Sequence, residues 1–461
     1  MHPNQQQRTH QQKRVTNFAA NSDSYCFFNL LTGEDFFEQV ESLLPEHRER
    51  LFPPTETLSL FLAQVMAADR SCQNAVNDAA IKRLVGGLSD CSTHTGAYCK
   101  ARQRLPLDMV STLTRYSGQM TSKQCPENWH WRGRPIKLVD GVTAVMPDTP
   151  ENQEAYPQSV NQASGLGFPL CRMVAIICHA SGSVLDMAMG SYNGKGSDEQ
   201  SLLRRILGTL NQGDVLIGDA FYATYFLLCT LQAAGIDGVF EQLGARKRVT
   251  DFRRGRSLGQ RDHIITLFKP SKKPDWMEQV DYDQAPNSIK IRELHTGQKI
   301  LVTTMLCPRQ VSKAELKKLY RERWHIELDL RNIKTTMGME MLSCKTPKMV
   351  EKEIWVHLLA YNLVRLLMAQ SALLADILPR QLSFKHTLQL WNSWCLHQVN
   401  NDDFNLEKLF FFMAQRVVGK RPGRIEPRAI KRRPKPFPLL TKSRHEAQQD
   451  IRKNGRPKKI R

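Results

Sequence analysis

The sequence of 461 residues predicts a mixed α/β core, preceded by a helical region and followed by a basic tail. Three observations predict this fold class. Apolar residues near helical spacing, as at 58–66, occur in residues 25–125. Short apolar strand-like runs alternate with helical segments from residue 136 onward. Residues 420–461 carry 16 Lys and Arg against three acids, so this segment holds +13 of the net charge of +20.

Within the core, the expected order is strand, β-hairpin, helix, strand, helix, strand. The corresponding residues are 136–139, 171–189 with a turn at 179–182, 199–210, 215–217, 223–235 and 239–240. Residues 243–299 are polar with short strand-like runs, which fits an inserted β-rich subdomain, and the core resumes at 300–304. Ser312 and Glu315 have the spacing of a capping box that begins a long helix.

The domain organisation follows from these changes in composition. We expect a disordered tail (1–24), a helical N-terminal region (25–125), a mixed α/β domain (126–378), a C-terminal helical region (379–420) and a basic tail (421–461). The apolar stretch 354–378 is interrupted by polar residues and suits a buried helix better than a membrane span. No signal peptide is apparent, and the mean hydropathy of −0.43 favours a soluble protein.

Cysteines and histidines show no metal-ligand pattern. The 11 cysteines include no C-x-x-C pair, which predicts reduced thiols without disulfides or structural zinc. The histidines are interpreted as structural or surface residues because no two have a convincing ligand spacing. Nucleic acid is the partner that the basic tail favours, although an anionic membrane attracts the same charge.

Three acids occupy positions from which they could hold divalent cations. Asp140 follows the strand at 136–139, Asp219 follows the strand at 215–217, and Glu327 lies in the helix that begins at Ser312. Phosphodiester chemistry with two hard cations needs carboxylates of this kind. Position alone also fits two turn or capping aspartates and a solvated helical glutamate.

One helical face combines Glu327 with an aromatic ring and two cations. At about 100° per residue, Tyr320, Arg323, Glu327 and Lys334 fall within about 60° of one another. Arg323 and Lys334 suit DNA phosphates next to a metal-bound one. A solvated helix with an Arg–Glu pair at i,i+4 is the alternative.

The spacing Tyr-x₂-Arg-x₃-Glu-x₆-Lys at these four positions resembles the YREK signature of the IS-4 family of bacterial insertion-sequence transposases. The segments 140–143 and 218–222 look similar to that family's regions around its two catalytic aspartates. The 107 residues between Asp219 and Glu327 resemble its β-rich insertion, and residues 424–435 resemble its C-terminal end. The resemblance covers about residues 55–440.

This resemblance implies that residues 25–125 form an N-terminal DNA-binding domain and residues 126–378 a ribonuclease-H-like catalytic domain. In that domain Asp140, Asp219 and Glu327 bind Mg²⁺, with Mn²⁺ as a substitute. It implies a cut-and-paste DNA transposase: water frees a 3′-OH at each transposon end, and that hydroxyl attacks target DNA. It further implies a homodimer on paired terminal inverted repeats, in the bacterial cytoplasm and at the nucleoid. Some relatives place a Trp at the start of the strand before the catalytic helix, where this chain has Ile300 and Leu301. Excision through a hairpin intermediate therefore stays open.

Several cations are candidates for contact with DNA, and a solvated surface is the alternative for each. A helix-turn-helix is expected where a helix at 78–85, the Gly86-Gly87 break and a basic helix ending near Leu105 follow one another. In the tail, residues 453–458 resemble an AT-hook core. The predicted DNA-binding residues are Tyr320, Arg323, Lys334, Arg246, Lys247, Arg248, Arg253, Arg254, Arg256 and Arg456.

Two other functions are compatible with these observations. A catalytically silent, transposase-derived DNA-binding protein or repressor would keep the basic residues, but it would not need acids among phosphates. A nuclease that cuts DNA without joining it would need the same acids.

Overall fold

The computed structural model describes residues 34–45, 51–87, 91–194, 196–247, 249–397, 406–418 and 440–455. The predicted tail at 1–24, Arg248, Arg456 and residues 419–439 of the predicted C-terminal region and basic tail lie outside the described residues.

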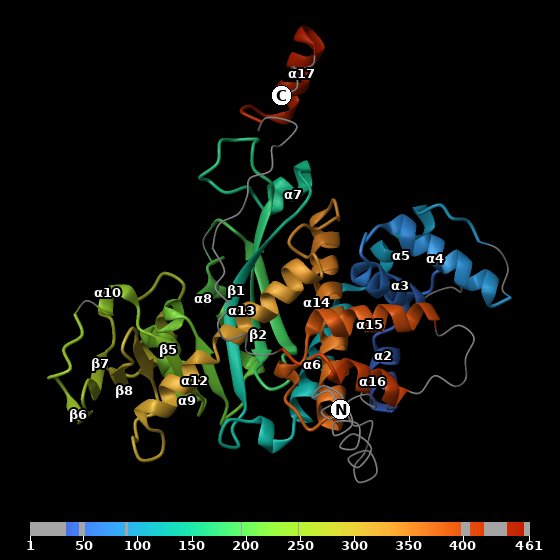
Figure 1. Cartoon of the computed structure of the whole chain (residues 1–461). Coiled ribbons are helices and arrows are strands. Elements are labelled where there is room, and N and C mark those ends of the chain that lie inside the picture. Colours follow the sequence, from blue (N-terminus) through green and yellow to red (C-terminus); the bar gives the residue numbers. More distant parts are fainter. Residues whose placement is uncertain are drawn as a thin grey trace, which may run out of the picture.

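A mixed sheet forms the centre of the molecule (Figure 1). Its nine strands follow the order β3-β2-β1-β4-β5-β9-β8-β7-β6. Strand β1 pairs antiparallel with β2 and parallel with β4, and β4 pairs parallel with β5. The strands are β1 (Ile136–Val145), β2 (Leu170–Cys178), β3 (Val184–Ser191), β4 (Val215–Gly218), β5 (Asp237–Glu241), β6 (Arg256–Gly259), β7 (Asp262–Phe268), β8 (Ser288–His295) and β9 (Ile300–Thr303). This arrangement fits a ribonuclease-H-like core and agrees with the predicted element order.

The segment 243–299 is β-rich as predicted, but its strands are continuous with the core sheet. Strand β8 pairs with β9, and β7 and β6 extend the same sheet outward. Shared backbone hydrogen bonds therefore join this inserted β-rich segment to the core sheet. Within this extension, the fully buried Arg292 of β8 forms an ion pair with Asp262 of β7 at 2.6 Å. Short helices α10 (Gly244–Lys247) and α11 (Gln279–Gln284) complete the segment.

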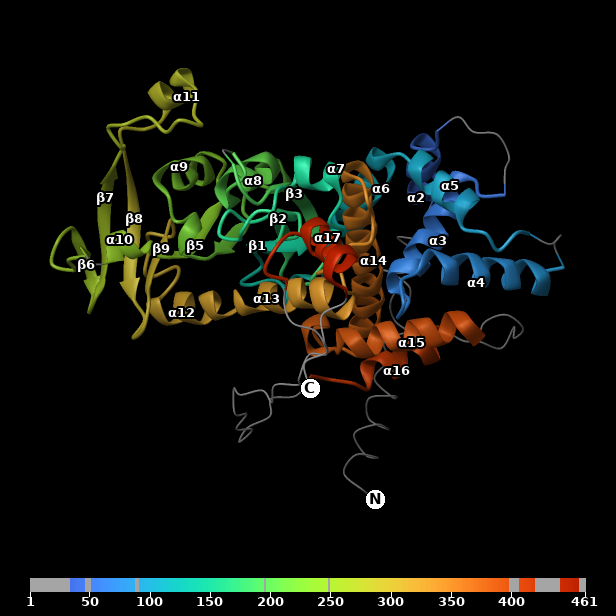
Figure 2. The same cartoon turned by 90° about the horizontal axis from the view of Figure 1, so that it is seen from above.

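Helices cover both faces of the sheet (Figure 2). On one face lie α8 (Glu199–Ile206) and α9 (Tyr225–Ala233), and on the other lie α12 (Lys313–Arg321) and α13 (Trp324–Arg331). The apolar side chains of β4 are fully buried between them, as a strand covered on both faces requires. The remaining short elements of the core are α7 (Pro150–Ala155), η2 (Glu127–Trp129), η3 (Leu207–Thr209), η4 (Ala220–Tyr222) and η5 (Asn332–Thr336).

The long helix α14 (Pro347–Leu374) is a core helix. By length and composition it could cross a membrane, but 89% of its most apolar window is buried inside the protein. It packs against α6 (Leu107–Lys123) on one side and against α15 (Phe384–His397) and α16 (Leu406–Ala414) on another. The predicted C-terminal helical region thus contains α15 and α16, with η6 (Pro379–Gln381) before them, and the basic tail contains α17 (Arg444–Asn454).

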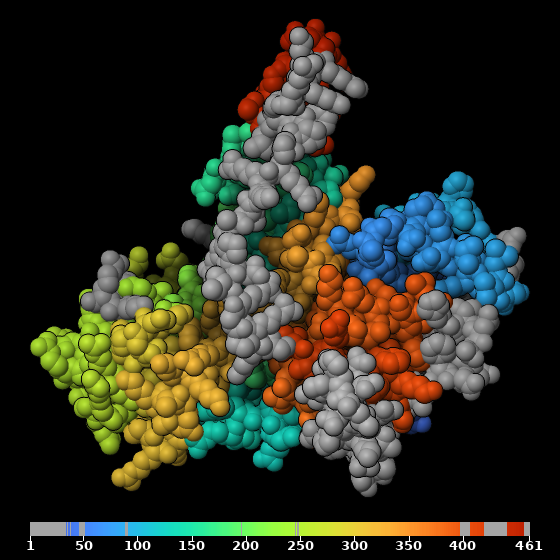
Figure 3. Space-filling model, in the orientation of Figure 1, coloured from blue at the N-terminus to red at the C-terminus, as the bar shows by residue number. Residues whose placement is uncertain are grey.

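The N-terminal region is helical as predicted and lies at the opposite end of the molecule from the β6–β8 extension (Figure 3). Besides α6, its helices are α2 (Glu34–Ser42), α3 (Pro54–Met66), α4 (Cys72–Val85) and α5 (Gly96–Arg104). Gly87 follows α4 with a φ of +68°, a left-handed conformation that suits glycine. Arg102 of α5 is buried over the rings of Phe61 and Tyr98, so this cation stabilises the helices and is not part of a DNA-facing surface. The ten cysteines of the described residues are all free.

Candidate active site

Asp140 and Asp219 lie side by side because of the register between β1 and β4. The last pair of this parallel ladder joins Leu138 to Ile217. Each aspartate stands two residues beyond that pair, in extended backbone. Side chains alternate along a strand, so the two carboxylates lie at one level on one face of the sheet. Asp140 is not at the end of its strand as predicted, because β1 continues to Val145 along β2.

Glu327 reaches the same region on α13, which packs against β1. The predicted capping box is present, with Ser312 and Glu315 bonding each other's backbone N–H at the start of α12. The expected continuous helix is nevertheless divided: α12 ends at Arg321 and α13 begins at Trp324. At this break the backbone N–H groups of residues 322, 323, 325 and 326 donate hydrogen bonds to the carbonyl oxygens three residues earlier. This 3₁₀-type pattern tightens the turn.

Arg323 lies between two of the acids. Its guanidinium nitrogens are 2.5 Å from a carboxylate oxygen of Glu327 and 3.6 Å from one of Asp140. Among the described residues, Asp140, Asp219 and Glu327 are not gathered as tightly as a metal-ligand set whose atoms all lie within 4.8 Å of one another. The Arg323 guanidinium, which pairs with both Asp140 and Glu327, offsets part of the negative charge of this site.

A fourth acid, Glu199, joins the site although sequence reasoning missed it. Glu199 is the first residue of α8, and its carboxylate lies 2.4 Å from where a Cβ on Gly141 would stand. The hydroxyl of the buried Tyr222 donates to Glu199 Oε2 at 3.2 Å. In the sequence, Glu199 follows the N-cap Asp198 and looks like an ordinary first-turn acid. The one sequence feature that points to Glu199 is Gly141, next to Asp140, because a residue without a side chain leaves room there for another carboxylate.

Two carboxylates of this site, Asp140 and Glu199, have a raised pKa, chiefly because they are buried. Burial raises the pKa of Asp140 to about 6, and the charges of Asp219 and Glu199 add to this shift. The Gly141 N–H and Arg323 act in the opposite direction but do not cancel it. Burial also raises the pKa of Glu199, and the charge of Asp219 contributes. Crowded carboxylate oxygens that disfavour their own ionisation are a donor set suited to hard divalent cations.

The other two residues of the helical signature differ in exposure. Tyr320 is buried, with the Lys299 ammonium 5.5 Å from the centre of its ring. Lys334 is half-buried in η5, a π-helical turn that follows α13. Tyr320 therefore packs in the core beside the site, whereas Lys334 is partly open to solvent.

The predicted basic cluster is also uneven. Arg246 is paired at 2.7 Å with the buried Glu293. Arg253 and Arg254 are largely exposed and share Asp251, and Arg256 is exposed on β6. Lys247 lies in α10, but its side chain is outside the described parts of the structure. At the start of β9, Ile300 and Leu301 are both buried, so no aromatic side chain stands there.

Comparisons with known proteins identify the class. Residues 131–363 match the profile of the family described as the transposase DDE domain, so the chain belongs to the DDE transposases. Within that class it is a member of the IS-4 family. Transposase InsG for insertion sequence element IS4 of Escherichia coli (strain K12) is 29% identical over 358 residues, which cover 75% of this chain and 78% of that protein. Among solved structures, a piggyBac transposase synaptic complex with hairpin DNA has 8% identity and a TM-score of 0.44, covering 87% of this chain and 86% of that one.

Family membership implies an enzyme of DNA transposition and recombination that cleaves DNA and transfers strands. DDE transposases use divalent metals.

Proposed function

We propose that this chain cuts the phosphodiester bonds at the ends of its transposon and joins the freed 3′-OH ends to target DNA, with Asp140, Asp219 and Glu327 as the ligands of two Mg²⁺ ions. The observation that carries this proposal is the β1–β4 register, which aligns Asp140 with Asp219 beside the helix of Glu327. Mn²⁺ is expected to substitute for Mg²⁺, because both prefer carboxylate oxygens.

The donor set fits these ions. All four neighbouring acids offer oxygen ligands. The raised pKa of Asp140 reflects its burial first and the charges of Asp219 and Glu199 second, and a divalent cation would offset those charges. When bound, the ions polarise the scissile phosphate and lower the pKa of the attacking water or hydroxyl. The side chains of this protein contribute the binding and positioning of the DNA phosphates.

Arg323 has two successive partners in this proposal. Without metal it neutralises Asp140 and Glu327. Once those oxygens serve as ligands, the guanidinium is released to hold a DNA phosphate next to the reacting one. Lys334, half-buried one turn beyond α13, holds a second phosphate. Glu199 is the fourth acid of the site, and the hydrogen bond that Tyr222 donates orients its carboxylate.

The rest of the chain binds DNA. We assign the DNA duplex to the N-terminal helices, to the exposed Arg253, Arg254 and Arg256, and to the basic tail with Arg456. The net charge of +20 supports this assignment, because cations release counterions from the phosphate backbone. Two ends must be joined together, so the active form is a homodimer on paired terminal inverted repeats in the bacterial cytoplasm and nucleoid.

The test is incubation of the purified chain with DNA that carries the element's own ends, with and without Mg²⁺, and with a target plasmid. Metal-dependent cleavage followed by joined products supports the proposal, and Asp140→Asn serves as the inactive control. Binding without cleavage would favour the silent DNA-binding protein. Cleavage without joining would favour the nuclease.

A further inference from the structure

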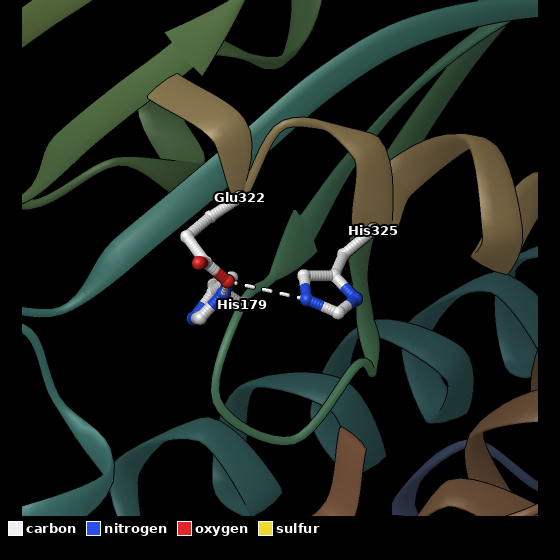
Figure 4. A group of neighbouring side chains, drawn as sticks. All are labelled: His179, Glu322 and His325. Atoms are coloured by element: carbon white, nitrogen blue, oxygen red, sulfur yellow. Dashed lines mark hydrogen bonds and ion pairs between the residues drawn. The ribbon is translucent and has the colours of Figure 1, made fainter. Parts of the chain in front are cut away.

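A second group of possible metal ligands lies beside the break between α12 and α13. His179 of the β2–β3 turn, Glu322 and His325 point toward one another (Figure 4). Glu322 Oε2 is 3.1 Å from Nε2 of His179 and 3.1 Å from Nε2 of His325. One ligand atom from each residue lies within 4.8 Å of the others, and all three residues are partly buried.

This group is separate from the acidic site. At about 100° per residue, Glu322 and His325 lie on one side of the helical path, whereas Arg323 and Glu327 lie on the other. The third member comes from a turn 143 residues earlier in the chain than Glu322. The spacing of histidines in the sequence predicted only structural or surface roles for them. Sequence spacing cannot detect a contact between His179 and Glu322, which are 143 residues apart.

We propose that His179, Glu322 and His325 bind one Zn²⁺ ion, which fastens the β2–β3 turn to the junction of α12 and α13. Two imidazoles and a carboxylate are ligands that zinc accepts, and water completes a four-coordinate site. Ligands at about 2.0–2.1 Å around a tetrahedral ion are about 3.3 Å apart. The two N···O separations of 3.1 Å are close to that value.

The surroundings hold the ligands in place. Arg380 donates to the carbonyl oxygens of Cys178 and His179, which fixes the turn that presents the imidazole. The bound ion would stabilise the segment from which Arg323 and Glu327 extend, so this zinc has a positioning role and takes no part in the reaction.

The experiment measures zinc binding without DNA, so its outcome is independent of the proposed cleavage. The full chain is freed of metal with a chelator and titrated with Zn²⁺ in excess Mg²⁺, against a chromophoric competitor. We expect one Zn²⁺ per chain. His325→Ala and Glu322→Gln should weaken binding by more than about 100-fold, because loss even of an outer-shell partner costs about 10–100-fold.

Two matched controls locate the ion. His94→Ala removes an exposed imidazole elsewhere, and Asp140→Asn alters the acidic site, so both variants should keep full zinc binding. Zinc should raise the Tm of the wild type and both controls but not that of the ligand variants. If His325→Ala does not fold, Glu322→Gln carries the test. A wild type that takes up no zinc, or a Glu322→Gln variant that binds like wild type, would reduce the group to a hydrogen-bonded network.

Discussion

Two acids on α13, only two residues apart, have opposite environments. Asp329 is fully buried and forms ion pairs with Arg365 and, at 2.6 Å, with Arg380. Glu327 is about one-third exposed, with 35% of its side-chain surface accessible, and shares the single Arg323 with Asp140. The first carboxylate has more cations than it can neutralise, whereas the second belongs to a group with an excess of anions.

This difference separates a structural acid from one available to a ligand. Each arginine donates to one oxygen of Asp329, so both oxygens of this buried carboxylate are held by cations. At the acidic site, burial and neighbouring carboxylates raise the pKa of Asp140 to about 6, so the metal-free protein holds charge that it would be more stable without. A carboxylate pKa raised by burial and by neighbouring charges is typical of functional sites. Substitutions at the acidic site and at Asp329 can test this difference.

The largest expected effect is on cleavage by Glu327→Gln. The change keeps the shape of the side chain but removes its charge, and we expect cleavage to fall by at least about 10⁴-fold, as when one member of a catalytic set is lost. End binding, measured by gel shift, should persist because most affinity comes from basic residues. Exposed Glu340→Gln is the control. Near-normal cleavage would exclude Glu327 as the third ligand.

The same conservative change at Asp329 should affect folding instead. Asp329→Asn leaves Arg365 and Arg380 buried without a counter-ion, so the free energy of unfolding should fall by about 3–5 kcal/mol. Urea denaturation measures this, and Glu340→Gln should stay within about 0.5 kcal/mol of wild type. An unchanged unfolding free energy would mean that Asp329 is not the centre of this network.

Arg323→Ala and Lys334→Ala should lower cleavage by about 10²-fold each, with much smaller changes in DNA affinity. Misplaced phosphates near the reacting one slow the reaction, while other cations still hold the duplex. Lys334→Arg should also be impaired because a planar guanidinium does not reproduce a compact ammonium. Lys345→Ala, at an exposed position, is the control in a single-turnover assay. Wild-type rates for both alanine variants would remove these residues from the site.

A smaller effect, opposite in sign to that of Asp329→Asn, is expected for Asp140→Asn. The pKa of Asp140 is about 6 in the folded protein against 3.8 for an ordinary Asp, so ionisation of Asp140 costs stability as pH rises through 6. Asp140→Asn removes that cost and should stabilise the metal-free protein by about 1–3 kcal/mol near pH 8. The advantage should vanish below about pH 4, where both states bind the proton. Urea denaturation with a chelator at both pH values checks this, and a destabilised variant near pH 8 would contradict the crowding of the acids.

Glu199→Gln offers a finer comparison. The charge of Glu199 contributes to the raised pKa of Asp140, so its removal should lower that pKa. The pH midpoint of the Asp140→Asn stabilisation should then shift downward in the Glu199→Gln background. An unmoved midpoint would place Glu199 outside the electrostatic group.

The sequence by itself determined the elements that local physics specifies. Apolar runs predicted β1, β2, β3 and β4, the Ser312–Glu315 capping box marked the start of α12, and helical periodicity brought Arg323 and Glu327 into contact. These features depend on neighbours within a few residues, so their signal is contiguous in the chain.

Only the tertiary structure decided which side chains meet across distant segments. Glu199 joins Asp140 because α8 packs over Gly141, and His179 reaches Glu322 across 143 residues. Glu327 and Asp329 look alike in sequence, and only the packing of Arg365 and Arg380 makes the second a structural ion pair. The continuity of β6–β8 with the core sheet likewise depends on the β8–β9 pairing. Strand register and helix packing depend on residues far apart in the chain, so the local periodicity of apolar residues does not predict them.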